Sequence, residues 1–119
     1  MTRLFKSLCC AGLVVGMTGI ASAAEVRGVL MDKMCSMKAM KDGQPAAQMH
    51  TRECALMPDC QKSGYGVFTA DAKFINLDAA GNAKALAALK ASKKKEGLNV
   101  RVTGKVSNDT IKVASLKLL

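Results

Sequence analysis

The stretch LNVRVTGKV, residues 98–106, carries the clearest structural signal in this chain of 119 residues. Its even-numbered positions are apolar or glycine, and its odd-numbered positions are polar. This period of two is typical of a strand that buries one face and exposes the other to solvent. We therefore predict a strand over residues 98–106, with Val102 in the core and Thr103 on the opposite face.

The segment that follows predicts a partner for this strand. Asn108 and Asp109 are turn-forming residues, and residues 110–118 are again rich in apolar side chains. The apolar phase slips by one residue between Val113 and Leu116. Since one extra residue in a strand produces such a slip, we expect a β-bulge near Ala114-Ser115.

Shorter apolar runs upstream predict three further strands and one helix. The strands are expected at residues 26–32, 66–70 and 73–77. The helix is expected over residues 83–95, with Asn82 as its N-cap, because a short polar side chain can accept a hydrogen bond from the first turn. Leu86 and Leu89 would then face the core.

The order of these elements predicts a mainly β fold, a small five-stranded OB-like barrel. One helix lies between strands 3 and 4, and a helical insert rich in Cys, His and Met, about residues 33–63, lies between strands 1 and 2. An open α+β sheet with the same elements is the alternative. Either way, residues 24–119 are expected to form one domain.

The first 23 residues have the composition of an export signal. Arg3 and Lys6 give a cationic start, residues 8–20 are uncharged and apolar, and Ala21-Ser22-Ala23 is a small-residue cleavage site. The apolar run is shorter than the roughly 20 residues that span a membrane. We therefore expect a periplasmic or secreted protein.

The chain is basic, with a net charge of +9, and loss of Arg3 and Lys6 with the signal would leave +7. Much of this charge lies in a cluster at the end of the predicted helix, made of Lys90, Lys93, Lys94 and Lys95. These lysines favour the negative end of the helix macrodipole, and contact with an anionic surface is the alternative. Nucleic acid is not expected as a partner, because an exported protein is separated from the nucleic acids of the cell. The polar face of residues 98–106 also lacks aromatic side chains for base stacking.

All the unusual chemistry lies in the insert. After the signal, every methionine falls within residues 31–57, and the insert also holds the single histidine and three cysteines. Pro45 and Pro58 predict a helix over residues 45–57, on which His50 and Cys54 share a face one turn apart. We predict a zinc or copper site with the Cys₃His composition of tetrahedral zinc. Its ligands would be Cys35, His50, Cys54 and Cys60, with Asp32 orienting His50 without binding the metal itself.

The methionines leave two interpretations open. Thioethers are soft ligands that favour Cu(I), so Met34, Met37 and Met57 are possible additional ligands. Methionine also fills gaps in cores that are poor in aromatic residues, and this chain has one Tyr, three Phe and no Trp.

The cysteines also allow two functions without a metal. Exported cysteines tend to oxidise, so a disulfide could staple a structural or interaction module and leave one thiol unpaired. A thiol redox protein is the third alternative, with His50 activating Cys54 or Cys35. Catalysis would need an oxyanion site and a substrate pocket, and no pattern in the sequence predicts either.

The ordered motifs also resemble a known pattern. They are Gly28-Val29-Leu30-Met31-Asp32 before Cys35, then His50, Cys54 and Cys60, then Gly64-Tyr65-Gly66, and finally VRVTGKV at residues 100–106. Together they resemble a group of small exported bacterial OB-fold-like domains of unknown function with a D-x-x-C, H-x(2,3)-C, C and V-x-V-x-G pattern. The chain departs from this group in two places: His50 is four residues before Cys54, and Pro58-Asp59 comes directly before Cys60. The resemblance implies a shared site and does not name its use.

Overall fold

The computed structural model describes residues 23–119 of the chain. The export signal predicted for residues 1–23 therefore lies outside the described residues, apart from Ala23. Within the part that the structure describes, no helix is both long and apolar enough to cross a membrane.

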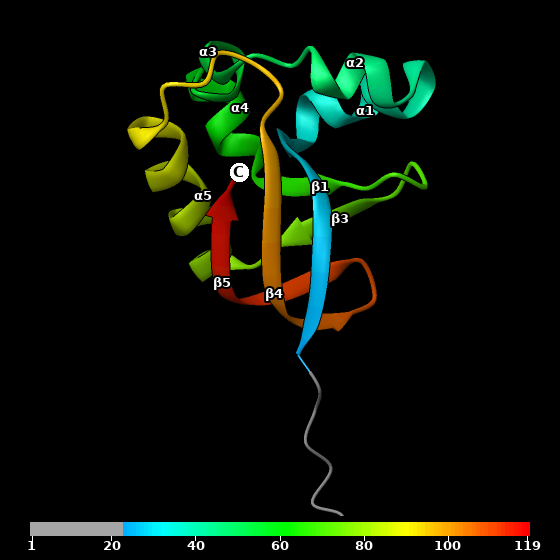
Figure 1. Cartoon of the computed structure of the whole chain (residues 1–119), viewed down its shortest axis with the longest axis vertical. Helices are drawn as coiled ribbons and strands as arrows, with labels where there is room; N and C mark the ends of the chain where they lie inside the picture. The colour runs from blue at the N-terminus through cyan, green and yellow to red at the C-terminus, as the bar shows by residue number, and fades with distance from the viewer. Residues whose placement is uncertain (1–22) are drawn as a thin grey trace, which may run out of the picture.

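Five strands form one sheet that closes into a ring (Figure 1). They are β1 Ala24–Asp32, β2 Tyr65–Phe68, β3 Phe74–Leu77, β4 Asn99–Ser107 and β5 Thr110–Leu118. Their order around the ring is β1-β2-β3-β5-β4, and β4 pairs with β1 to close it. Neighbouring strands are antiparallel except β3 and β5, which are parallel. All five predicted strands are present close to their expected bounds, and the ring replaces the alternative of an open sheet.

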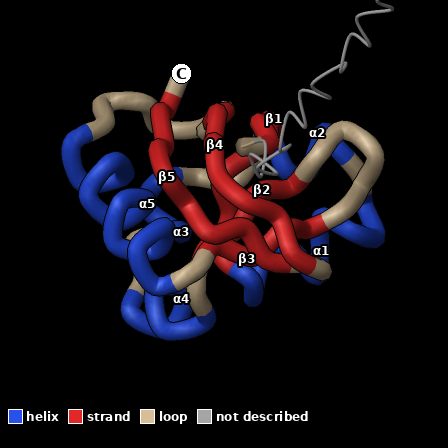
Figure 2. Tube along the Cα trace, turned by 90° about the horizontal axis from the view of Figure 1, so that it is seen from below, coloured by secondary structure: helices blue, strands red, loops and turns tan. Residues whose placement is uncertain are grey.

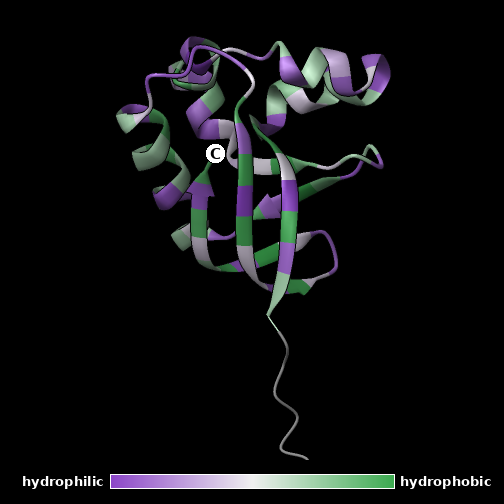
Figure 3. Cartoon of the chain, in the orientation of Figure 1, coloured by the Kyte–Doolittle hydropathy of each residue, from purple (hydrophilic) through white to green (hydrophobic). Residues whose placement is uncertain are grey.

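Strand β4 has the two faces that its alternation predicts. Val100 and Val102 are fully buried, whereas Thr103 is only partly buried on the other face. Figure 3 shows the same alternation as hydrophobic and hydrophilic bands along the strand. Val106 is the exception, because β4 there extends beyond the core and leaves 38% of this side chain exposed.

The predicted bulge is confirmed at Ala114. Thr103 pairs with Ser115 and Gly104 pairs with Val113, so Ala114 is the extra residue in β5. The strands approach closely here, because a Cβ atom at Gly104 would lie 2.1 Å from the carbonyl oxygen of Lys112. Only glycine fits this position without moving the backbone.

Helix α5, Ala79–Ala91, lies between β3 and β4 in the sequence and packs mainly against β5 (Figure 1). It begins four residues earlier than predicted, because Asp78 and not Asn82 is its N-cap. Asp78 Oδ1 accepts a hydrogen bond of 2.9 Å from the Gly81 backbone N–H. Asn82 instead accepts a 2.6 Å hydrogen bond from the backbone N–H of Tyr65, which joins the helix to β2. Leu89 is fully buried, as predicted.

The insert between β1 and β2 contains four short helices. They are α1 Lys33–Asp42, α2 Gln44–Gln48, α3 Arg52–Ala55 and α4 Pro58–Ser63. All four lie at one end of the ring in Figure 1, and the view from below in Figure 2 separates α1 and α2 from α3 and α4. Helices account for 39% of the structure and strands for 36%, so the domain is less dominated by β-structure than predicted.

The single helix predicted over residues 45–57 is wrong. Pro45 does lie in the first turn of α2, but the helix ends at Gln48. Thr51 is extended, with φ −91° and ψ 151°, and its side chain caps a new helix by accepting from the Cys54 N–H at 3.1 Å. Pro58 likewise begins α4. The polar N-cap at Thr51 outweighs continuation of the helix.

Candidate metal centre

Asp32 is the last residue of β1 and the N-cap of α1, and it is fully buried. Its Oδ2 atom accepts a hydrogen bond of 2.9 Å from the backbone N–H of Cys35. This bond spans the three-residue step of a capping interaction, so the spacing D-x-x-C brings the cysteine to the carboxylate. The other oxygen, Oδ1, is left free to face the insert.

The first turn of α1 is fixed by the end of α4. The Lys33 N–H donates to the carbonyl of Gly64 at 2.8 Å, and the Met34 N–H donates to Ser63 Oγ at 3.3 Å. Ser63 Oγ in turn donates to the carbonyl of Cys60 at 2.7 Å. These bonds connect the segment that carries Cys35 with the helix that carries Cys60.

His50 lies in the break between α2 and α3, and both helices are anchored to distant parts of the fold. Gln48 Nε2 donates to Asn99 Oδ1 at 3.0 Å, which ties α2 to β4. Arg52 Nε donates to the carbonyl of Leu89 at 2.5 Å, which ties α3 to the end of α5. The histidine is therefore held from both sides and retains only 8% exposure.

These elements bring three potential ligands together. One ligand atom each from Asp32, Cys35 and His50 lies within 4.8 Å of the other two. The structure thus contains an Asp/Cys/His group that could hold a metal ion. The sequence analysis predicts Cys35 and His50 as ligands but Asp32 only as the residue that orients His50, whereas the structure places Asp32 inside the group itself.

The contact between Asp32 and His50 has an unusual geometry. Asp32 Oδ1 and His50 Nε2 are 3.0 Å apart, and both side chains are buried. The contact lacks hydrogen-bond geometry, so within residues 23–119 neither atom has a hydrogen-bond partner. An unsatisfied buried polar atom costs about 1–3 kcal/mol, so two at one point need an explanation. A metal ion bound by both atoms would provide one.

Cys60 is buried next to this group. Its side chain is 6% exposed, and Asp32 and Cys35 are both close enough to affect the pKa of its thiol. The Cys60 thiol lies outside the set within 4.8 Å, so its distance to the group would have to shorten for it to become a fourth ligand.

The carboxylate controls the protonation of its neighbours. Burial and then the charge of Asp32 raise the pKa of Cys35 to about 12, and the same two causes raise the pKa of Cys60. Burial also opposes ionisation of Asp32, but His50 and the Cys35 backbone N–H outweigh it and hold the pKa of this carboxyl below its ordinary value. The resulting centre has a negative carboxylate beside protonated thiols. A bound cation would reverse this preference by stabilising the thiolates.

Cys54 lies outside the group, although the sequence analysis includes it among the ligands. The break in the predicted helix removes the shared face with His50, and Cys54 is exposed in the first turn of α3.

The methionines considered as possible ligands do not fill gaps in the core, which is one of the two roles that the sequence leaves open. Met34, Met37 and Met57 are 52%, 70% and 52% exposed, so core packing does not explain them.

A cavity of about 380 Å³ leads to the centre. Cys35 and His50 line it, together with Met49 and Cys54. Met49 is 70% exposed, whereas His50 is buried, so the cavity runs from the surface of the insert to the ligand group. The cavity therefore brings exposed residues of the insert next to Cys35 and His50, whereas the atoms Asp32 Oδ1 and His50 Nε2 are themselves closed to solvent.

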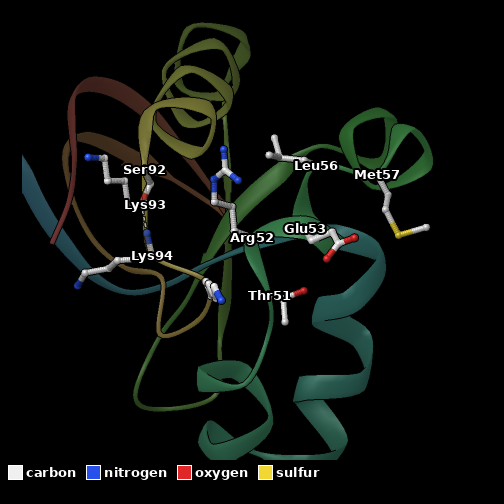
Figure 4. A pocket seen from close by; sticks show the side chains of 9 residues that line it. Thr51, Arg52, Glu53, Leu56, Met57, Ser92, Lys93 and Lys94 are labelled. Carbon is white, nitrogen blue, oxygen red and sulfur yellow. Dashed lines mark hydrogen bonds between the residues drawn. The ribbon is translucent and has the colours of Figure 1, made fainter.

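A larger cavity of about 700 Å³ lies between α3 and residues 92–95 (Figure 4). Arg52 lines this cavity, but its guanidinium already donates hydrogen bonds to the carbonyls of Leu89 and Lys90. The Lys93 and Lys94 side chains extend away from Leu56 and Met57 in Figure 4. Lys90, Lys93, Lys94 and Lys95 are all exposed, and α5 ends before the last three. This cavity therefore lacks a converging set of polar groups.

Two residues that support the centre, Arg52 and Thr51, differ in how far the sequence indicates their roles. Arg52 positions His50 through a bond to a residue 37 positions away, which no local pattern indicates. Thr51 does have a local signal, because a threonine three residues before Cys54 is a possible N-cap.

Comparison with known proteins gives no match: no protein family, curated protein or solved structure is significantly similar to this chain.

Proposed function

We propose that this protein is a small exported binding protein that holds a soft transition metal ion, zinc or copper, at the centre built by Asp32, Cys35 and His50. The observation that carries the proposal is the buried pair Asp32 Oδ1 and His50 Nε2, 3.0 Å apart with a cysteine in the same group, in which neither atom has a hydrogen bond of good geometry within residues 23–119. Carboxylate, thiolate and imidazole are all zinc ligands, and thiolate and imidazole also bind copper.

Cys60 is the best candidate for a fourth ligand. It is buried beside Asp32 and Cys35, and the α1–α4 hydrogen bonds hold its helix against the centre. In a tetrahedral zinc site with bonds near 2.1 Å, neighbouring ligand atoms are about 3.4 Å apart. The distance of 3.0 Å between Asp32 Oδ1 and His50 Nε2 is close to this spacing, and the third ligand atom, from Cys35, lies within 4.8 Å of the other two.

The remaining parts of the proposal concern fold and location. The strand order β1-β2-β3-β5-β4, with a helix between β3 and β4, supports an OB-like barrel. The charged, apolar and small-residue order of residues 1–23 supports export to the periplasm or beyond. Exposure of Lys90 and its neighbours supports contact with an anionic surface as a secondary property.

A disulfide between Cys35 and Cys60 is the competing function, because these thiols are close neighbours. It would turn the insert into a stapled structural module and remove two ligands. A nucleophilic thiol is less well supported. The raised pKa values of Cys35 and Cys60 keep both thiols protonated, whereas a reactive cysteine needs a lowered pKa.

Anaerobic titration of the reduced protein with Zn(II) and Cu(I) tests the proposal. The wild type should bind one ion, and His50→Ala should weaken binding because it removes a ligand without removing a thiol. Thr103→Ala is the control, since this side chain lies on β4 away from the insert. Failure of the reduced wild type to bind either ion would overturn the metal function and leave the disulfide module.

A further inference from the structure

The insert carries an unusual number of exposed methionines, which the proposed ligands do not explain. Five methionines of the insert are 52–70% exposed, namely Met34, Met37, Met40, Met49 and Met57. Only Met31 among the described methionines is buried, at 2% exposure. Exposed thioethers add apolar surface and are open to oxidation, so five of them in one insert call for a chemical reason.

One of these five methionines lines the cavity that reaches the centre. Met49 and Cys54 are exposed residues of its lining, whereas Met31 and His50 are buried and Cys35 is half-buried. His50 is more than nine-tenths buried, and its Nε2 atom has no hydrogen-bond partner among the described residues. The cavity therefore has soft sulfur atoms among its exposed residues, and the buried His50 in its wall carries a nitrogen without a hydrogen bond among the described residues.

We infer that this cavity is an uptake route for Cu(I), in which Met49 and Cys54 bind the ion at the surface and pass it to Cys35 and His50. This inference rests on the proposed metal-binding function and deepens it by naming copper as the ion and by giving a role to Cys54. Thioether and thiolate ligands together select Cu(I), whereas zinc does not need a thioether.

Transfer along this route is an exchange of ligands without electron transfer. Copper remains Cu(I), its bonds to Met49 and Cys54 break, and bonds to Cys35 and His50 form. The Cys54 thiol releases its proton to solvent when copper binds and regains one when copper leaves. Cys35 releases one proton as it becomes a thiolate ligand. Met49 binds as a neutral ligand, so Cys54 is the one residue at the exposed end that loses a proton on capture.

The rate of copper loading tests the inference. Reduced protein is mixed anaerobically with Cu(I) held by a coloured chelator, and the loss of colour gives both the loading rate and the final occupancy. The variants are Met49→Leu and Cys54→Ser. Both preserve the fold, since Leu replaces Met with similar volume and the Thr51 cap bonds only the backbone of Cys54. Met40→Leu is the matched control, because Met40 is 54% exposed but does not line the cavity.

We expect each of the two variants to slow loading by about tenfold. The affinity at equilibrium should stay within about threefold of the wild type, because the final ligands are intact. Met40→Leu should load as the wild type does, and Met49→Leu should not change the rate of Zn(II) loading. Wild-type rates in both cavity variants would overturn the route while leaving the copper site. If the wild type binds zinc but no copper, the route is wrong and the metal site stands, and if it binds neither ion, both fail.

Discussion

Replacing Asp32 with asparagine separates metal binding from folding. Asparagine keeps the shape of the side chain and an oxygen that can accept from the Cys35 N–H, so the cap of α1 survives. The variant loses the negative charge that faces His50 at 3.0 Å. We therefore expect a small effect on the metal-free protein and a large effect on stabilisation by the ion.

The size of this effect follows from linkage. At an ion concentration of 100 times the wild-type dissociation constant, binding adds about 2.7 kcal/mol to the free energy of unfolding. Loss of the carboxylate should weaken affinity by about 10- to 100-fold, which is the range for residues that only support metal ligands and is the minimum expected for a ligand such as Asp32. At the same ion concentration the variant should then gain only about 0.4–1.4 kcal/mol.

Urea unfolding of the reduced protein, with and without Zn(II), measures both numbers. Asp78→Asn is the matched control, because Asp78 also caps a helix, through a 2.9 Å bond from Gly81, but lies outside the candidate centre. It should retain the full gain of about 2.7 kcal/mol. An equal gain in Asp32→Asn and in the wild type would refute the placement of Asp32 at the ion.

Three further predictions concern the core, pH and processing. Val102→Ala should lower the free energy of unfolding by about 1–3 kcal/mol, because Val102 is fully buried, and Thr103→Ala should cost much less; equal shifts in the denaturation midpoint would mean that the faces of β4 are misassigned. Metal affinity should fall as pH drops, because thiolates and neutral imidazole are the binding forms, and an affinity independent of pH between 8 and about 5 would contradict these ligands. Amino-terminal sequencing of the exported protein should begin at Ala24; finding Met1 retained in a membrane fraction would contradict cleavage after Ala23.

Local patterns predict the sheet well because its signals extend over few residues. The alternation around Val102 indicates which face of β4 is buried, and the phase slip in β5 locates the bulge at Ala114. The bounds of the insert are also correct, since β1 ends at Asp32 and β2 begins at Tyr65. In each case the structural feature is decided by residues that are close to one another in the sequence, so a local pattern can indicate it.

The candidate centre is less predictable because tertiary contacts decide it. The four-residue spacing of His50 and Cys54 predicts a shared helix face, but Thr51 caps a new helix and separates the two side chains. The bond from Arg52 to Leu89 then fixes α3 against α5, over a distance in sequence that no periodicity covers. The proximity of Asp32 and Cys35 is the part of the centre that the D-x-x-C spacing can indicate, because one capping bond joins the two residues.

The mass of the intact protein, purified from the periplasm and measured under native and denaturing conditions, tests the metal site most directly. The proposal predicts a native mass that exceeds the denatured mass by one zinc or copper ion. It also predicts a denatured mass with all three thiols of Cys35, Cys54 and Cys60 reduced. Equal native and denatured masses, with two hydrogens lost to a disulfide, would contradict the metal site and establish the stapled module.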